Sequence, residues 1–432
     1  MTAKIEIAAP SSIESTTMRV VAWRLLPFLM LCYFVSFVDR VNAGFAALEM
    51  NKDLHLSPAV FGLGGGLFFV SYFLFEVPSN LAMERVGARR WIARIMLTWG
   101  VIAAAMALIQ GPRSFYLLRV LLGAAEAGFF PGVMLYITYW FPSQYRARIV
   151  GWFTVAIPLS AFLGSPLSAA LLGADGVLGL RGWQWMFILE GAPAVLLGIV
   201  CLFVLKDRPG DAGWLAPAQR DWLTARLGEE AAAARPVPHR SLWKVLTDGR
   251  VLALSLVLAG TTANSSGIQL WAPLMLKSYG LSNMQVGLAN AVPFAVASVA
   301  MILWGRRSDR LRERVWHTVL PLLLVTVSLA GVLVFQSLAA TIVILTLAIV
   351  GIYACKGPVW AVSTEWLAAG AAAAGLAQIN ALSNLAGFGT IYVVGVVKSA
   401  TGSFSLGMLP LMALAAASAA AMWLLGRTVK QP

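Results

Sequence analysis

The sequence predicts an all-α membrane protein with twelve transmembrane helices in two pseudo-symmetric six-helix bundles, and three observations support this fold class. Hydrophobic residues make up 59% of the 432 and charged residues only 12%, whereas soluble domains carry about 25% charged residues. Twelve apolar segments are each long enough to cross a bilayer, which takes roughly 20 residues. These segments fall six and six around one polar stretch.

The order of the segments divides the chain into two halves and a linker. The first six segments cover residues 20–48, 58–83, 91–110, 115–139, 149–172 and 185–205. The second six cover residues 251–276, 286–304, 315–335, 339–367, 370–397 and 406–425. We therefore expect an N-terminal bundle (1–205), a linker (206–248) and a C-terminal bundle (249–432). Proline at the start predicts one short linker helix from Pro217 to about Ala234, anchored by Trp222 and Leu223.

Positive charge predicts the orientation. Bases crowd the N-terminal end, the linker, the C-terminal tail and every second loop, including Arg85, Arg89, Arg90, Arg146, Arg148, Arg306, Arg307, Arg310, Arg312 and Arg314. The other face carries only Lys52, Arg113, Arg181, Lys277 and Lys398. The positive-inside rule then places the linker and both termini in the cytoplasm, in a multi-pass protein of the cell inner membrane. The formal net charge of +13 thus serves orientation and requires no nucleic-acid partner.

Cysteine and histidine indicate no metal site, cofactor or enzyme. The three cysteines fall within apolar segments and the three histidines are scattered, so neither a disulfide framework nor a ligand cluster is expected. No nucleophile–base spacing or cofactor loop occurs. The first seventeen residues lack the features of a signal peptide, so we expect the first span to be retained.

Charged residues inside the apolar segments mark the candidate site, because each costs about 2.5–3.5 kcal/mol on insertion scales. Asp39 and Arg40 lie in the outer half of span one. Arg119 and Glu126 lie in span four, two helical turns or roughly 10 Å apart. The opposite directions of the two spans place Asp39 and Arg119 at similar depth, as partners. Arg40 is then left to face a cavity, and Glu126 is left nearly alone.

This arrangement suits proton coupling. A carboxyl group without a close base can bind and release a proton near neutral pH, because a low dielectric disfavours its charged form. A carboxylate beside an arginine can change partners when an anionic substrate competes for the arginine. The alternative is that two buried ion pairs only fix the packing of the helices.

The second half contributes Lys356, which lies near the middle of span ten beside a Gly-Pro break. Together with Arg40 it could hold a dicarboxylate or a monoanion between the halves; alternatively it pairs with Glu126 or Glu76. Tyr72 lies one turn before Glu76 on the same face. Further polar candidates for the lining are Asn264, Gln269, Asn380 and Asn384, of which Asn384 is closest to the midplane.

A charged motif is repeated half a chain apart. Glu84 and Arg85 follow span two, and Asp309 and Arg310 follow span eight. Acids and bases at matching helix ends suit a cytoplasmic latch between helices. At this point the chain resembles the major facilitator superfamily, whose loop signature reads Gly-x-x-x-Asp-Arg-x-Gly-Arg-Arg. The first copy departs from it at Asn80 and Glu84, and the second keeps Gly305, Asp309 and Arg310.

Longer blocks narrow the resemblance. They are Asp39 to Ala46, Phe75 to Asn80, Arg119 to Pro131 and Arg181 to Gly191, which look like the anion:cation symporter family and its bacterial phthalate, tartrate and hydroxyphenylacetate-type transporters. The resemblance implies that Asp39 and Glu126 are protonation sites and Arg119 is a charge partner. It also implies that Arg40, Tyr72 and Asn384 face the substrate. Phe37 stands where relatives of the galactonate-transporting type carry Tyr, which brings a polyhydroxylated substrate into question.

The sequence therefore predicts a proton-coupled symporter that imports an organic carboxylate by alternating access. The substrate is an aromatic acid or a tartrate-like dicarboxylate, the other partners are protons and the bilayer, and we expect a monomer. Two alternatives stay open. One is an exporter or exchanger of neutral or amphipathic solutes, and the other is a non-transporting membrane sensor.

Overall fold

The computed structural model describes residues 12–233, 247–366 and 372–428, and in these ranges the regular structure is helical without strands. Twelve helical stretches there are long and apolar enough to cross a membrane, which confirms the predicted fold class. The first half contains α1 (Ser12–Asp53), α2 (Pro58–Val86), α3 (Ala88–Ala105), α4 (Pro112–Glu126), α5 (Phe129–Trp140), α6 (Ser143–Thr154), α7 (Ala156–Leu171) and α8 (Gly182–Val204). The linker contains α9 (Pro217–Ala233), and the second half contains α11 (Gly249–Lys277), α12 (Asn283–Leu311), α13 (Val315–Val334), α14 (Leu338–Trp366), α15 (Ala372–Thr401), α16 (Phe404–Gly407) and α17 (Leu409–Thr428).

Two spans that the sequence predicts as single helices are each built from two. Span four breaks between α4 and α5, where Gly128 has a φ of +87°. An added Cβ at Gly128 would lie 2.2 Å from Ser79 Oγ, so the break depends on glycine for both its backbone and its space. Span five is interrupted at Val155, between α6 and α7. Pro158 follows this point and lacks the N–H that would bond the carbonyl of Thr154.

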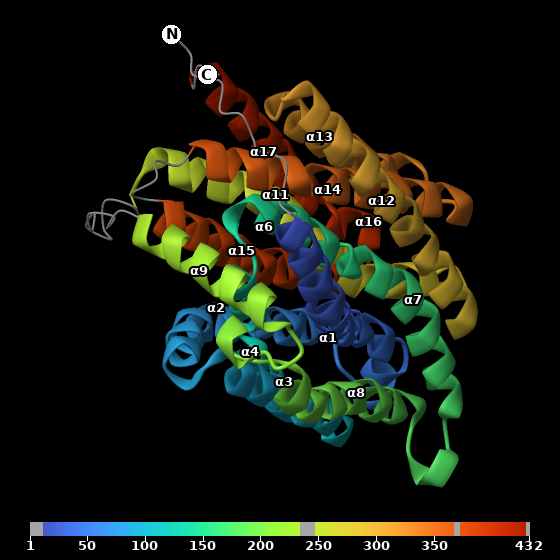
Figure 1. Cartoon of the computed structure of the whole chain (residues 1–432). Helices are drawn as coiled ribbons and strands as arrows, with labels where there is room; N and C mark the ends of the chain where they lie inside the picture. The colour runs from blue at the N-terminus through green and yellow to red at the C-terminus, as the bar shows by residue number, and fades with distance from the viewer. Residues whose placement is uncertain (1–11, 234–246, 367–371, 429–432) are drawn as a thin grey trace.

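The helices form two groups that meet in the centre of the molecule (Figure 1). In the first group α3 packs on α8, α2 on α4 and α1 on α7; in the second, α11 packs on α15 and α17, and α14 on α12 and α13. The two groups are joined where α2 packs on α15, α7 on α12 and α1 on α11.

Glycines permit the close approach of the two groups. An added Cβ at Gly44 of α1 would lie 2.9 Å from the carbonyl oxygens of Gln269 and Leu270 in α11. An added Cβ at Gly62 of α2 would lie 3.0 Å from the carbonyl oxygen of Ile391 in α15. Small residues of this kind let helix backbones pack in van der Waals contact inside a membrane.

The linker helix is confirmed, because α9 covers residues Pro217–Ala233. Leu223 is fully buried, as expected of an anchor, and Trp222 packs partly against the core. At the other end of α9, Glu230 forms an ion pair with Arg146 of α6 at 3.3 Å. Residues 234–246 of the predicted linker lie outside the described residues.

The predicted latch residues have a different environment in each half. Asp309 at the end of α12 pairs with Arg314 at 2.6 Å, and Arg314 also pairs with Glu365 of α14 at 3.3 Å. Among the described residues, Glu84, Arg85 and Arg310 form no ion pair. In the first half the N-terminal end of α3 is bound by Asp207 and not by Glu84. The Oδ1 of Asp207 accepts a hydrogen bond from the backbone N–H of Arg89 at 2.9 Å.

Candidate functional site

A cavity of about 70 Å³ lies between the two helix groups, near the middle of the spans. α1, α2 and α4 line it from one side, and α11, α14 and α15 line it from the other. Its lining residues are Phe37, Asp39, Arg40, Gly65, Phe68, Phe69, Arg119, Thr262, Ser265, Ser266, Gln269, Leu270, Lys356, Asn384 and Ile391. Five of the predicted site residues, Asp39, Arg40, Arg119, Lys356 and Asn384, are therefore brought together.

Arg40 is the centre of the polar network. Its Nε donates to Glu126 Oε1 at 2.7 Å, and its Nη2 lies 2.5 Å from the same oxygen. Ser36, one turn before Arg40, donates its hydroxyl to this oxygen at 2.9 Å. The expectation that Glu126 is left nearly alone is therefore wrong. α4 ends at Glu126, and the long Arg40 side chain reaches this residue from α1.

Three aromatic rings lie close to the Arg40 guanidinium. Its Cζ lies 4.9 Å from the ring centroid of Phe37, 5.3 Å from that of Tyr72 and 5.6 Å from that of Phe68. Cation–π contacts of this type are strongest where water is excluded. Tyr72, a predicted substrate contact, thus lies beside Arg40.

The expected pair between Asp39 and Arg119 is also absent among the described residues. Asp39 Oδ2 accepts a hydrogen bond from Trp99 Nε1 at 2.7 Å, and its Oδ1 accepts one from Asn42 at 3.3 Å. Arg119 donates to the carbonyl oxygens of Gly64 and Gly65, both at 3.3 Å, because glycine has no side chain to cover them. The sequence predicted that Asp39 and Arg119 are partners of one another, and the structure gives each of them other partners.

Lys356 faces the cavity without an acidic partner. Its Nζ lies 4.4 Å from the ring centroid of Tyr353, and no described acid forms an ion pair with it. The alternative pairing with Glu126 or Glu76 is not seen. Glu126 is held by Arg40, and Glu76 Oε1 accepts a hydrogen bond from Asn380 of the other half at 2.8 Å.

The charge of the lining favours an anion. Among the described lining residues the cavity has three cations, Arg40, Arg119 and Lys356, and one carboxylate, Asp39. The hydroxyl groups of Thr262, Ser265 and Ser266 and the amides of Gln269 and Asn384 supply further hydrogen-bonding groups. A small anion that carries hydroxyl or carboxyl groups could satisfy these partners.

Some residues of the site were missed by sequence reasoning. The polar run from Thr261 to Ser266 inside an apolar span is a signal that could have identified the α11 lining. Ser36 shares a helix face with Arg40 and could have been found by its spacing. Trp99 carried no such signal, because a tryptophan in an apolar segment usually only packs.

A charged cavity enclosed between two six-helix bundles is the architecture of a secondary transporter. The family model of the Major Facilitator Superfamily matches residues 29–391. The chain belongs to the major facilitator superfamily of membrane transporters, as its loop motifs indicated.

Individual proteins agree with this assignment. The chain is 50% identical over 421 residues to a putative tartrate transporter of Agrobacterium vitis, which covers 98% of this chain and 97% of the relative. It is 40% identical over 401 residues to a quinolone resistance transporter of Acinetobacter baumannii, with 91% of each chain covered. The fold is similar to that of a bacterial homologue of the lysosomal transporter Spinster in an inward-facing, occupied conformation. That comparison has a TM-score of 0.74 and 20% identity, over 94% of this chain and 97% of the other.

Proposed function

We propose that this protein is a proton-coupled symporter that imports a small organic dicarboxylate of the tartrate type. The observation that carries the proposal is the group of three cations, Arg40, Arg119 and Lys356, around a cavity between the halves. The 50% identity to a protein named as a tartrate transporter supports this substrate class. Phe37 lacks the hydroxyl group of the tyrosine in galactonate-type relatives, and this is compatible with tartrate if the hydroxyl groups of Thr262, Ser265 and Ser266 replace it.

Binding would use both halves of the protein. In this proposal Arg40 and Lys356 each hold one carboxylate, while Tyr72 and Asn384 position the substrate. A substrate carboxylate that takes over Arg40 frees Glu126 to accept a proton, and Asp39 is the second protonation site. Rocking of the halves would then expose the loaded site to the other side.

The same proposal includes the remaining features of the topology. Both termini and α9 lie in the cytoplasm, the bundles are residues 1–205 and 249–432 with a linker at 206–248, and the protein acts as a monomer in the inner membrane. The twelve candidate spans among the described residues support this topology, since an even number of crossings returns a chain to the side on which it started. Glu84, Arg85, Asp309 and Arg310 would form the latch in a conformation other than the observed one, in which, among the described residues, only Asp309 of the four is ion-paired.

Uptake into proteoliposomes tests the proton coupling. With an inward pH gradient we expect labelled tartrate to accumulate above its external concentration, and without a gradient we expect only equilibration. The physical reason is that each proton that moves down its gradient provides the free energy to move the anion. Liposomes treated with a protonophore are the control. Equal accumulation with and without the gradient would reject the coupling.

Replacing Lys356 by Gln is expected to discriminate between substrate classes. The second carboxylate of tartrate would lose its cation, at a cost of about 2–5 kcal/mol for a buried charged contact. Affinity for tartrate should therefore fall by at least roughly 30-fold, while a monocarboxylate held by Arg40 alone should bind nearly as before. Ligand-induced thermal shifts of the purified variant measure this. If the variant loses the same affinity for monocarboxylates as for tartrate, Lys356 either binds the one carboxylate that both classes share or is needed for folding.

The 40% identity to a quinolone resistance transporter favours one competing function, the export of amphipathic solutes. That function does not require a cation triad, and it predicts that transport is independent of Arg40. Transport by an Arg40→Ala variant distinguishes the two functions.

A further inference from the structure

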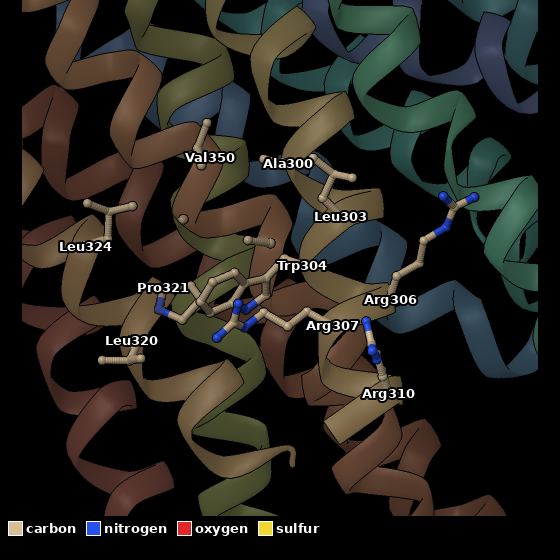
Figure 2. A pocket seen from close by; sticks show the side chains of 12 residues that line it. Ala300, Leu303, Trp304, Arg306, Arg307, Arg310, Leu320, Pro321, Leu324 and Val350 are labelled. Carbon is tan, nitrogen blue, oxygen red and sulfur yellow. The ribbon is translucent and has the colours of Figure 1, made fainter. Parts of the chain in front are cut away.

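A second and larger cavity, of about 720 Å³, lies at the surface of the second half. α12 and α13 both pack on α14, and the crevice lies between them with α14 as its floor. Figure 2 shows Arg306, Arg307 and Arg310 on one side of the crevice and Leu320, Pro321 and Leu324 on the other. It is separate from the central cavity, with which it shares no lining residue.

The wall of the crevice is apolar over most of its length. Ala300, Leu303 and Trp304 come from α12, and Val350, Gly351 and Ala354 come from α14. Leu303 and Leu320 are 60% and 49% exposed, so the crevice opens toward the surrounding lipid. From Ala300 to Arg310 it extends roughly 15 Å along the helix axis, which is about the depth of one leaflet of the hydrocarbon core.

The three arginines at one end have no acidic partner among the described residues, although acids are nearby. Asp309 and Glu365 are both bound by Arg314. Glu313 is bound by His317 at 2.5 Å and accepts backbone hydrogen bonds from Trp316 and His317. The exposed guanidinium groups of Arg306, Arg307 and Arg310 are therefore available for an external anion.

We propose that this crevice, lined by Trp304, Pro321 and Gly351 and closed by the three arginines, binds an anionic phospholipid of the proposed cytoplasmic leaflet. The arginines hold the phosphate of the headgroup, and one acyl chain lies in the apolar crevice. Arginine is suited to phosphate because its planar group donates two parallel hydrogen bonds. Basic pockets at this depth match the negative charge of the cytoplasmic leaflet. The proposal rests on the predicted orientation and not on the transported substrate.

Native mass spectrometry of the purified full-length protein tests the site, with phosphatidylglycerol as the probe. We expect one phosphatidylglycerol to be retained per wild-type molecule. In the R306Q/R307Q variant the affinity for phosphatidylglycerol should fall on the order of 30-fold, because each of the two lost bases contributes about 1 kcal/mol. A matched control is R24A/R90A, which removes two exposed arginines from the first half and should bind as the wild type does. Leu324→Trp, which fills the crevice and leaves the arginines in place, should also lose the lipid.

Further arms of the experiment identify the ligand. Phosphatidylcholine should compete weakly, because its headgroup has no net charge, and millimolar inorganic phosphate should not displace the lipid. Thermal unfolding of each variant establishes that it is folded. Retention of phosphatidylglycerol by folded R306Q/R307Q, an equal loss in R24A/R90A, or equal competition by phosphatidylcholine would overturn the proposal. Displacement by inorganic phosphate alone would also overturn it.

Discussion

Replacing Arg40 by Ala is expected to abolish carboxylate uptake. Arg40 lines the central cavity, and its side chain is 22% exposed beside a Glu126 that is 1% exposed. Its loss removes the proposed cation for the substrate and leaves a buried carboxylate without its ion pair. Truncation of one partner of such a pair costs about 2–5 kcal/mol, so uptake should fall at least roughly 30-fold. Initial rates of labelled tartrate uptake into proteoliposomes measure the effect.

Two controls separate a binding defect from a folding defect. The double variant R40A/E126Q removes the uncompensated charge, so it should regain thermal stability without regaining uptake. Arg113→Ala changes an exposed base of α4 outside the cavity and should transport as the wild type does. If R40A folds and still transports tartrate, the substrate is not held by this arginine, and export of an amphipathic solute becomes the better description.

The fold was accessible from the sequence because hydropathy and loop charge both report on the membrane. The helix breaks were not, since the apolar pattern continues through residues Ala127 to Pro131 without a polar residue. A positive φ at Gly128 depends on the backbone and on the neighbouring Ser79, which belongs to another helix. Neither is visible in the hydropathy of span four.

For the candidate site, too, the sequence identified the residues but not their contacts. The costly residues Asp39, Arg40, Arg119 and Lys356 were identified because charge is rare in a membrane span, and all four line the cavity. The partners of Asp39, Arg40 and Arg119 were predicted wrongly because depth along straight helices ignores the rotation of each helix and the reach of each side chain. The Arg40 side chain reaches Glu126 and forms an ion pair with it, and the indole N–H of Trp99 donates a hydrogen bond to the carboxylate of Asp39.

The contact of Glu126 with Arg40 leads to a second prediction, which concerns the coupling of protons to transport. Glu126→Gln is expected to lose accumulation of tartrate against its gradient by at least about tenfold, while the exchange of internal for external tartrate persists. The amide oxygen can still accept from Ser36 and Arg40, so the variant imitates the protonated carboxyl group. Such a carrier can bind substrate and reorient with it, but it has no proton to release on this residue, and net transport stops.

Parallel measurements of accumulation and exchange distinguish this outcome from simple damage. In the wild type both lower external pH and a larger inward pH gradient should increase accumulation, because protonation from outside precedes entry. Exchange by E126Q should depend less on external pH than exchange by the wild type, since of the two proposed protonation sites only Asp39 remains. Glu229→Gln, which alters an exposed acid of α9, is the matched control and should resemble the wild type. If E126Q accumulates tartrate normally, protons are coupled elsewhere, and Asp39 is the next residue to change. If a folded E126Q loses exchange as well, Glu126 acts in substrate binding through Arg40 and not as the coupling group.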